Sequence, residues 1–382
     1  MYIAYNQEMY KCGHSFITGY EFSRILNKLK KNTPKYEWIK LYSSKAIKDT
    51  IMRTEKSFKN FFRKKGGFPR FKSRKRIKKE SFYFIKESIH FDTGCKNIIK
   101  IPILGNVRIT ERNYLPKQLY VSSGRVIKDG NKYYLMFIYD TECTSIRHSR
   151  DSFGIDVGIK NYATIASSTG DIITVTHFKD WKNLKELEAK KIKLQQILSH
   201  KVEVNYYRKL NNYLDSHHEE PSEKYKNIMK GESYNTSGVR RLRKKINIID
   251  EHIRNIRRDF ICKLVDHIVV KAKPKCITIE DLSISNMLQE GTHDLHRYIS
   301  FSGFYYFRIK LIELCKKYQT TLRIANRYFA SSKKCSNCGH KVKDLKLSDR
   351  VFKCPKCGLV IDRDENASIN LLHTKKYTVE IA

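Results

Sequence analysis

The sequence lacks the marks of a secreted or membrane-bound protein. It has no signal-peptide pattern and no apolar run near the ~20 residues that a membrane-spanning helix requires. It also has no internal repeat and no long low-complexity tract, which argues against a solenoid or a fibrous protein. We therefore expect a soluble, intracellular protein, and its 382 residues allow two or three domains with cores of their own.

Acidic residues are scarce in relation to basic ones. The chain has 39 aspartates and glutamates against 76 lysines and arginines, which gives a formal net charge of +37. That much positive charge repels itself unless a polyanion neutralises it. Nucleic acid is the natural partner because each phosphate contact releases counterions. An acidic membrane surface, or a basic protein with no such partner, is the alternative.

The ten cysteines do not have the pattern of a disulfide scaffold. Four of them follow the spacing CxxC-x15-CxxC, which is typical of a tetrahedral zinc site: Cys335, Cys338, Cys354 and Cys357. Gly339 and Gly358 follow the two pairs, as the turn of each knuckle requires. Four thiolates close the coordination shell, so we expect a structural zinc ion, with an iron–sulfur site or a redox pair as alternatives. The other six are expected to be reduced core thiols: Cys12, Cys95, Cys143, Cys262, Cys276 and Cys315.

The N-terminal third divides into helical and strand-forming parts. Apolar spacing predicts helices over residues 18–31, with Thr18 as a cap, and over 44–64. Residues 81–140 contain short β-rich segments separated by turn residues, and KDGNK is a hairpin signal. We expect a small antiparallel barrel or a curled sheet there.

From Phe153 onward the pattern indicates a different domain. We expect three strands in a meander, followed by two long helices, a strand, a helix, a strand and a final helix. The helices are predicted over residues 181–200 and 238–271, over 303–318, and over RDENASINLLHTK. The two later strands are predicted over CITIED and TLRIANRY. A polar loop is predicted over about 211–236.

Between Arg53 and Lys79 the chain has its most basic stretch, with phenylalanines interleaved. Aromatic rings stack on bases while cations hold phosphates, so this pattern favours nucleic-acid contact over a solvated linker. The residues that we predict to contact nucleic acid are Arg70, Lys72, Arg74, Lys75, Arg76, Arg240, Arg241 and Arg257.

Three acids form the candidate catalytic set. Asp156 and Glu280 each follow an apolar strand, and Asp364 opens the last helix. Carboxylates are the ligands that Mg²⁺ prefers, and two such ions clamped between carboxylates cleave phosphodiesters. The acids converge only if their strands are neighbours, as in an RNase H-like sheet. Asp281 competes with Glu280, and Asp362 with Asp364.

The chain resembles the TnpB (OrfB) family, which is encoded by bacterial insertion sequences and related to type V CRISPR effectors. The matching segments span about residues 5 to 375 in family order. They are GFPRFKSRK, IPILGNVRI, GNKYYLMF, GIDVGIKNYATIAS, NIRRDF, ITIEDLSISNM, YFASSKKCSNCGH and FKCPKCGLVIDRDENASINLL.

The resemblance implies an α+β multidomain protein with an RNase H-like (RuvC) nuclease domain, a zinc ribbon insertion, a wedge-like antiparallel β-barrel and a helical recognition domain. The implied domains are recognition over 1–79, wedge over 80–150, RuvC-like over 151–332, zinc ribbon over 333–358, and the last RuvC-like helix and tail over 359–382.

The resemblance also implies an activity. It predicts an RNA-guided DNA endonuclease in which base pairing selects the sequence, and which cuts beside a short adjacent motif. Asp156, Glu280 and Asp364 match the catalytic positions. The implied cofactors are two catalytic Mg²⁺ ions (Mn²⁺ as a substitute), one Zn²⁺ and a guide RNA from the element. The implied partner is double-stranded target DNA, and no membrane is involved. The implied location of the protein is the bacterial cytoplasm, at the nucleoid.

The chain departs from the family pattern at its start, where the first strand of the barrel is expected to be missing. A truncated copy is one interpretation of this departure. Two other functions stay open at this stage: a nucleic-acid-binding regulator or remnant that does not cut, and an accessory transposase protein. The transposase alternative has no HxH metal pair with a catalytic tyrosine to support it.

Overall fold

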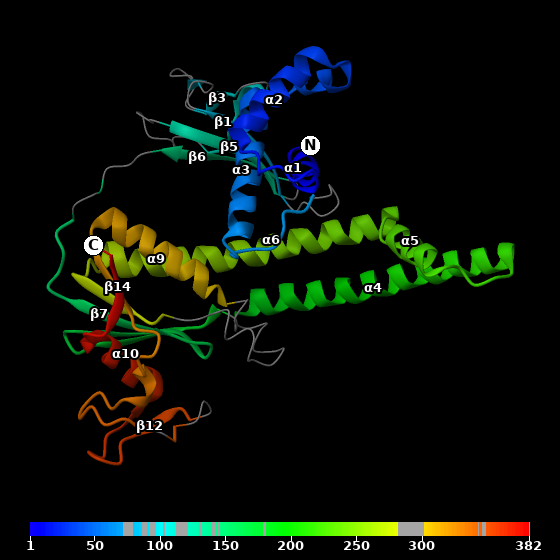
Figure 1. Cartoon of the computed structure of the whole chain (residues 1–382). Coiled ribbons are helices and arrows are strands. Elements are labelled where there is room, and N and C mark those ends of the chain that lie inside the picture. Colours follow the sequence, from blue (N-terminus) through cyan, green and yellow to red (C-terminus); the bar gives the residue numbers. More distant parts are fainter. Residues whose placement is uncertain are drawn as a thin grey trace. The chain divides into compact units, whose positions relative to one another are not determined.

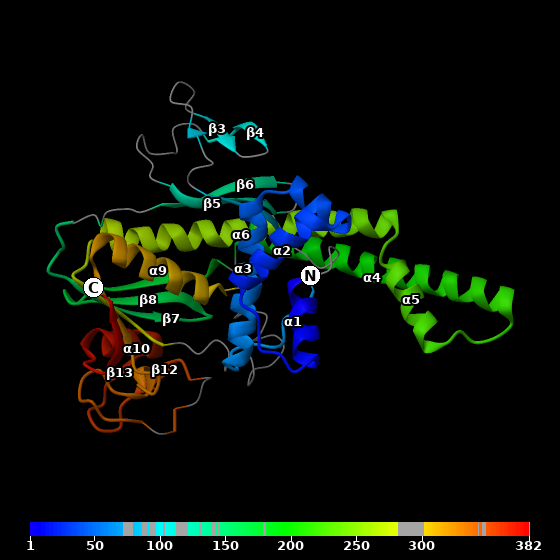
Figure 2. The ribbon, with the colours of Figure 1, turned by 45° about the horizontal axis from the view of Figure 1, so that its top comes forward.

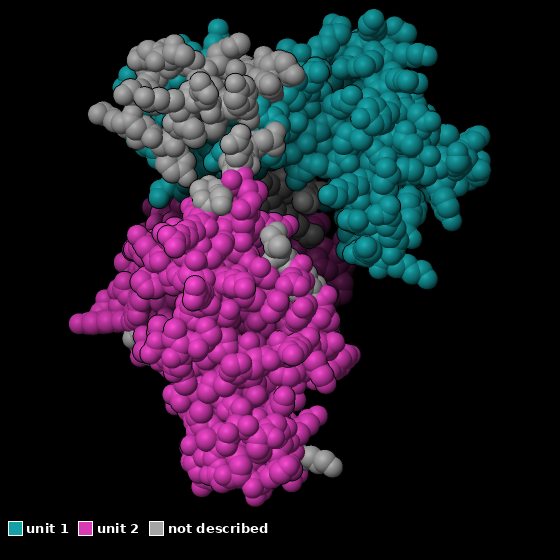
Figure 3. Space-filling model, turned by 90° about the vertical axis from the view of Figure 1, so that its left-hand side faces the viewer, with its two compact units in different colours: residues 1–141 teal, residues 142–382 magenta. Residues whose placement is uncertain are grey.

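The fold is described from a computed structural model of the chain. The residues that it describes are 1–71, 79–85, 90–91, 97–101, 104–111, 121–129, 132–139, 143, 146–178, 181–281, 302–342, 344–345 and 349–381. They form two compact units, Met1–Thr141 and Glu142–Ala382, drawn in teal and magenta in Figure 3. Among the described helices, none is long and apolar enough to cross a membrane.

The first unit begins with helices packed around aromatic side chains. They are α1 (Tyr2–Lys11), α2 (Gly19–Asn32), the 3-10 helix η1 (Pro34–Leu41) and α3 (Ser44–Phe62). Thr18 caps α2 in a reciprocal arrangement: its hydroxyl accepts from the Glu21 N–H at 3.3 Å, and the Glu21 carboxylate accepts from the Thr18 N–H at 2.8 Å. The helices expected over 18–31 and 44–64 are confirmed, whereas α1 was not predicted.

In the part of this unit that the structure describes, the strands form two three-stranded antiparallel sheets. One has the order β1 (Lys79–Ile85), β5 (Val121–Asp129), β6 (Lys132–Tyr139), and the other the order β2 (His90–Phe91), β3 (Ile98–Ile101), β4 (Gly105–Arg108). Asp129 pairs with Lys132, so the hairpin predicted at KDGNK is confirmed. The predicted strands are present, and closure of the sheets into a barrel stays a prediction.

The second unit contains a six-stranded mixed sheet. Its order is β14 (Tyr377–Ile381), β11 (Thr321–Ala325), β10 (Cys276–Ile279), β7 (Ser152–Val157), β8 (Asn161–Ser167), β9 (Ile172–Thr176). The predicted meander is β7–β8–β9, which is antiparallel throughout. Strand β10 runs parallel to both β7 and β11, so segments far apart in sequence become central neighbours.

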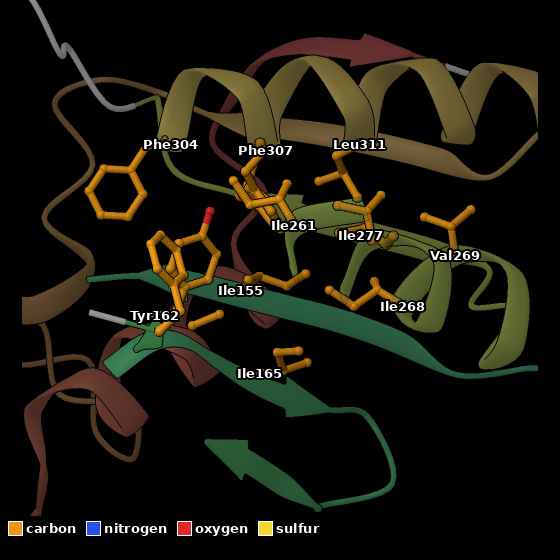
Figure 4. Close-up of a cluster of buried hydrophobic side chains, with 14 of the residues drawn as sticks. Ile155, Tyr162, Ile165, Ile261, Ile268, Val269, Ile277, Phe304, Phe307 and Leu311 are labelled. Atoms are coloured by element: carbon orange, nitrogen blue, oxygen red, sulfur yellow. The ribbon is translucent and has the colours of Figure 1, made fainter. Parts of the chain in front are cut away.

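Helices lie on both faces of this sheet. On one face, α6 (Ser237–Asp266), the π-helix η5 (His267–Lys271) and α9 (Phe304–Tyr318) bury a large apolar core. Figure 4 shows Ile155 and Ile165 of the strands in the same cluster as Phe307 and Leu311 of α9. On the other face, α10 (Arg363–His373) packs against β7 and β8 (Figures 1 and 2). The acids discussed below lie on the α10 face.

A long helical hairpin projects from this core. Helix α4 (Lys182–His217) packs along α6, and α5 (Glu223–Ser233) connects them (Figures 1 and 2). The polar loop expected over 211–236 is wrong in large part. Tyr213, Tyr225 and Met229 are spaced to pack within the hairpin, with the ring centroids of the two tyrosines 4.9 Å apart, and this packing outweighs the polar composition.

Candidate active site and metal centre

Two of the three predicted acids lie side by side at the ends of parallel strands. Strands β7 and β10 pair with Ile155 opposite Ile279, and the next residue on each strand is an acid, Asp156 and Glu280. Both isoleucines belong to the core under α6 and α9. Because side chains alternate along a strand, both acids face the opposite side of the sheet, where α10 lies.

Helix α10 brings the third acid to the same place. It crosses β7 so closely that a Cβ on Gly154 would collide with the Ser368 carbonyl oxygen and the Leu372 nitrogen. Gly154 lies on the same face as Asp156, two residues earlier. Asp364 lies one helical turn before Ser368, at the N-terminus of α10. The close approach at Gly154 therefore places the first turn of α10 near the ends of β7 and β10.

The three carboxylates interact electrostatically. Burial raises the pKa of Asp156 well above its ordinary value, and the negative charges of Glu280 and Asp364 raise it further, against the opposing charge of Arg363. Burial also raises the pKa of Glu280 and that of Asp364, the latter with a contribution from Asp362. Such a concentration of buried negative charge is costly without a cation, and it is the environment that a divalent ion relieves.

The competing acids have other partners. Asp281 accepts hydrogen bonds from Arg308 at 2.7 Å and from Arg327 at 3.0 Å and 3.2 Å. Although partial burial acts to raise its pKa, these two guanidinium groups lower it below the ordinary value. Asp362 caps α10 and accepts from the backbone N–H groups of Asp364 and Glu365 at 2.8 Å and 3.3 Å. Both competitors thus have structural partners.

Three further residues lie near the acids, and two of them, Ser331 and Arg350, were not singled out from the sequence. The hydroxyl of Ser331, in the short 3-10 helix η6 (Ser331–Lys333), donates a hydrogen bond to Glu280. Lys160 and Arg350 are close enough to Asp364 to oppose the rise in its pKa. Ser331 lies in a run of small and basic residues with no pattern of its own, so only the packing of the chain reveals it.

The four predicted zinc ligands form a cluster in the C-terminal part of the second unit. Their sulfur atoms all lie within 4.8 Å of one another. The Sγ atoms of Cys335 and Cys357 are 3.6 Å apart, and those of Cys338 and Cys354 are 3.5 Å apart. Zinc–sulfur bonds of ~2.3 Å place tetrahedral sulfur atoms about 3.8 Å apart, so the cluster fits a zinc ion.

The two halves of the cluster have the same backbone geometry. The N–H of Gly339 donates to the carbonyl of Cys335, and that of Gly358 to the carbonyl of Cys354, both at 3.0 Å. Both glycines have φ of +74°, which favours glycine and confirms the expected knuckles. Strands β12 (Val351–Lys353) and β13 (Val360–Asp362) form a hairpin, and β13 leads directly into α10.

Among the described residues, this quartet is the one group of three or more potential ligands gathered closely enough to hold a metal ion by proximity alone. The three carboxylates interact through their charges but are not gathered to that degree. The remaining cysteines only partly match the expectation. Cys276 and Cys315 are buried, whereas Cys12 and Cys143 are exposed, so for these two the prediction of core thiols is wrong. Cys262 is half-buried, and Cys95 lies outside the described residues.

The predicted nucleic-acid contacts fall in three settings. Arg70, Arg240 and Arg241 are exposed, the last two in the first turns of α6. Arg257 is half-buried; burial lowers its pKa, against the charges of Glu188 and Asp250. The remaining four lie outside the described residues: Lys72, Arg74, Lys75 and Arg76.

Four phenylalanines of the basic stretch lie at the surface of the first unit, whereas Phe58 is buried in its helical core. Phe62 and Phe71 are 57 % and 66 % exposed, and Phe61 and Phe68 are also exposed, with their ring centroids 5.3 Å apart. Because these rings are exposed among lysines and arginines, they are available to stack on bases. Contact between the rings and nucleic-acid bases stays a prediction.

Several known proteins are similar to this chain in sequence. Residues 304–371, which include α9, η6, the cysteine cluster and most of α10, match the family described as Cas12f1-like, TNB domain. The chain is 27 % identical over 386 residues to a protein of Escherichia coli (strain K12) named "Putative RNA-guided DNA endonuclease InsQ", covering 97 % of this chain and 84 % of that protein.

Two further similarities come from a viral protein and from a solved structure. The "TnpB-like protein L79" of Acanthamoeba polyphaga mimivirus is 31 % identical over 247 residues, covering 64 % of this chain and 41 % of that protein. A solved Cas12f1-sgRNA-target DNA complex aligns with a TM-score of 0.47 at 18 % identity, covering 87 % of this chain and 71 % of that one. Residues 304–371 thus match the Cas12f1-like, TNB domain family, and the chain is similar to proteins named putative RNA-guided DNA endonuclease and TnpB-like protein.

Proposed function

We propose that this protein is an RNA-guided DNA endonuclease whose catalytic residues are Asp156, Glu280 and Asp364. The observation that carries the proposal is the convergence of these acids from β7, β10 and α10, with mutual repulsion that a divalent cation relieves. The names of the relatives support the same activity. The order of strands β9-β8-β7-β10-β11, with β10 parallel to both neighbours, supports an RNase H-like nuclease domain.

The roles of the residues follow from their positions. The three carboxylates would hold two Mg²⁺ ions, which when bound supply an activated water and stabilise the leaving oxygen of the phosphodiester. The carboxylates themselves need not touch DNA. Lys160 is exposed and close to Asp364, so it is suited to neutralise charge on a phosphate.

The remaining parts have supporting roles in this proposal. The four cysteines hold one structural zinc ion, and their four thiolates close its coordination shell. Residues 151–332 and 359–382 form the nuclease domain, 333–358 the zinc ribbon, 80–150 the wedge and 1–79 the recognition domain. Guide RNA and target DNA neutralise the net charge of +37, with exposed arginines such as Arg70 and Arg240 on phosphates.

A cleavage assay tests the proposal. The protein is co-expressed with RNA from the end of its element and given matched double-stranded DNA with Mg²⁺. We expect cutting by the wild type, none by Asp156→Ala, and unchanged RNA binding by that variant. Cutting by Asp156→Ala at the wild-type rate would show that the carboxylate assignment is wrong. RNA binding with no cutting by the wild type would favour a regulator.

A further inference from the structure

The segment that leads into the cysteine cluster touches both the sheet and α10. Ser331 is buried, at 3 % exposure, and its hydroxyl donates to the Glu280 carboxylate. Four residues further along the chain is Cys335, the first cysteine of the cluster. The residues from 331 to 336 therefore connect a strand-end acid to a metal site.

Two asparagines fasten this segment to α10. The side-chain amide of Asn370 donates to the carbonyls of Ser331 and Lys334 at 2.8 Å and 2.6 Å. Asn366 donates to the carbonyl of Lys334 at 2.7 Å and accepts from the Ser336 N–H at 2.9 Å. Both asparagines are buried, at 0 % and 6 % exposure for Asn366 and Asn370. Buried hydrogen bonds of this kind are expensive to break because each broken one leaves a polar group without a partner.

Both asparagines lie on α10, the helix that also carries Asp364. Asn366 is two residues from Asp364, and Asn370 lies one turn further along the same helix. The segment thus has fixed contacts with the helix that carries Asp364 and with the side chain of Glu280. By contrast, the neighbouring acid Asp281 is held by Arg308 and Arg327, which lie outside the segment.

We propose, resting on the proposed function, that Ser331 is a positioning residue for Glu280. In this arrangement the folded cysteine cluster fixes the segment 331–336, the segment orients the Glu280 carboxylate through the Ser331 hydroxyl, and Asn366 and Asn370 keep Asp364 in register with it. The integrity of the zinc site then sets the affinity of the carboxylates for divalent ions. Hydrogen-bond donors to metal-binding carboxylates act in this way in other sites.

The primary test measures Mn²⁺ binding to the full-length, zinc-loaded protein by titration calorimetry. Ser331→Ala is expected to weaken Mn²⁺ binding roughly tenfold to a hundredfold, the usual effect of losing such a partner. Ser331→Thr keeps the hydroxyl and is expected to restore most of the affinity. The matched control is Ser233→Ala, since Ser233 is also fully buried and donates to a backbone carbonyl, that of Met229, at 2.8 Å.

A kinetic measurement separates positioning from simple loss of structure. In the cleavage assay, Ser331→Ala is expected to require a higher Mg²⁺ concentration for half-maximal rate, with the KM for DNA unchanged. Equal Mn²⁺ affinity in wild type and Ser331→Ala, or failure of Ser331→Thr to restore it, would overturn the proposal. A wild type that binds Mn²⁺ at the carboxylates but does not cut DNA would instead count against the proposed function alone.

A separate variant tests whether the zinc site affects divalent-ion binding by the carboxylates. Cys357 is the exposed cysteine of the four, so Cys357→Ser disturbs the core least. This variant is expected to contain less zinc and to bind Mn²⁺ more weakly, while Ser331→Ala keeps its zinc content. If Cys357→Ser loses zinc and still binds Mn²⁺ as the wild type does, the cysteine cluster does not act on Glu280. Circular dichroism of each variant establishes that it is folded before Mn²⁺ is added.

Discussion

Gly154 on β7 lies directly beneath Ser368 of α10, with no room for a side chain between them. A Cβ at position 154 would lie well inside 3.0 Å of the Ser368 carbonyl oxygen, closer than real Cβ atoms come to other groups. Since this contact is made by backbone on both sides, a rotamer change cannot relieve it. The position of α10, and with it that of Asp364, depends on the absence of a side chain at residue 154.

Gly154→Ala is therefore expected to push α10 away from the sheet. Overpacking of this kind costs about 1–3 kcal/mol, so the melting temperature should fall, and Mn²⁺ binding should weaken as well. The control is Gly231→Ala in α5, where nothing lies within 4 Å of the new Cβ and alanine favours the helix. A Gly154→Ala protein with the wild-type melting temperature would contradict the contact.

Asp156→Asn is expected to stabilise the protein in the absence of divalent ions. Burial and the charges of Glu280 and Asp364 oppose ionisation of Asp156, and a neutral amide of the same shape removes that repulsion. The gain should be about 0.5–2 kcal/mol, the range that is common for a single stabilising substitution. Thermal unfolding with a divalent chelator that leaves zinc bound measures it. A lower melting temperature for Asp156→Asn would mean that the carboxylates do not repel one another.

Asp281→Asn is expected to distinguish Asp281, which has structural partners, from the acids that we propose to be catalytic. It loses the ion pairs with Arg308 and Arg327, which are partly exposed and are together worth about 1 kcal/mol. DNA cleavage with Mg²⁺ should persist, in contrast to Glu280→Gln. If Asp281→Asn lost cleavage while Glu280→Gln kept it, Asp281 would be the catalytic acid and the assignment of Glu280 would be wrong.

Asp151 gives the fold a measurable pH dependence. It accepts hydrogen bonds from the backbone N–H groups of Ser152 and Ser168 at 2.8 Å and 3.0 Å and from the hydroxyls of Ser167 and Ser168. Partial burial acts to raise its pKa, but these bonds outweigh burial and lower the pKa below its ordinary value.

The sign of the effect follows from that lowered pKa. The stabilisation is complete above the ordinary carboxylate range and is lost as the pH falls below about 4, through the pKa of the folded state. Unfolding temperatures measured from pH 6 to pH 3 should therefore fall more steeply for the wild type than for Asp151→Asn. Parallel curves for the two proteins would contradict this role of Asp151.

Much of the second unit followed from local sequence patterns. The apolar run before Asp156 and the run before Glu280 predict buried strands, and their pairing as parallel neighbours follows once both are placed in one sheet. The cysteine spacing predicts the cluster because the geometry of a knuckle is set within a few residues. These features were predictable because local chemistry determines them.

Other features depend on contacts between distant residues and were not predictable. The donation from Ser331 to Glu280 joins residues 51 positions apart, and no local pattern marks the serine. The helical course of residues 211–217 and α5 is stabilised by packing in the hairpin, against a polar composition that favours a loop. Cys12 was predicted to be a core thiol, but it lies at the exposed C-terminal end of the short helix α1, beside Lys11 and Gly13.

The most direct test of the central claim is a crystal structure of the full chain soaked with Mn²⁺, with anomalous data collected for manganese. We expect manganese peaks within coordination distance of the carboxylates of Asp156, Glu280 and Asp364, and their disappearance in Asp156→Ala. Peaks bound elsewhere, or a soaked crystal in which these three carboxylates hold no manganese, would contradict the assignment.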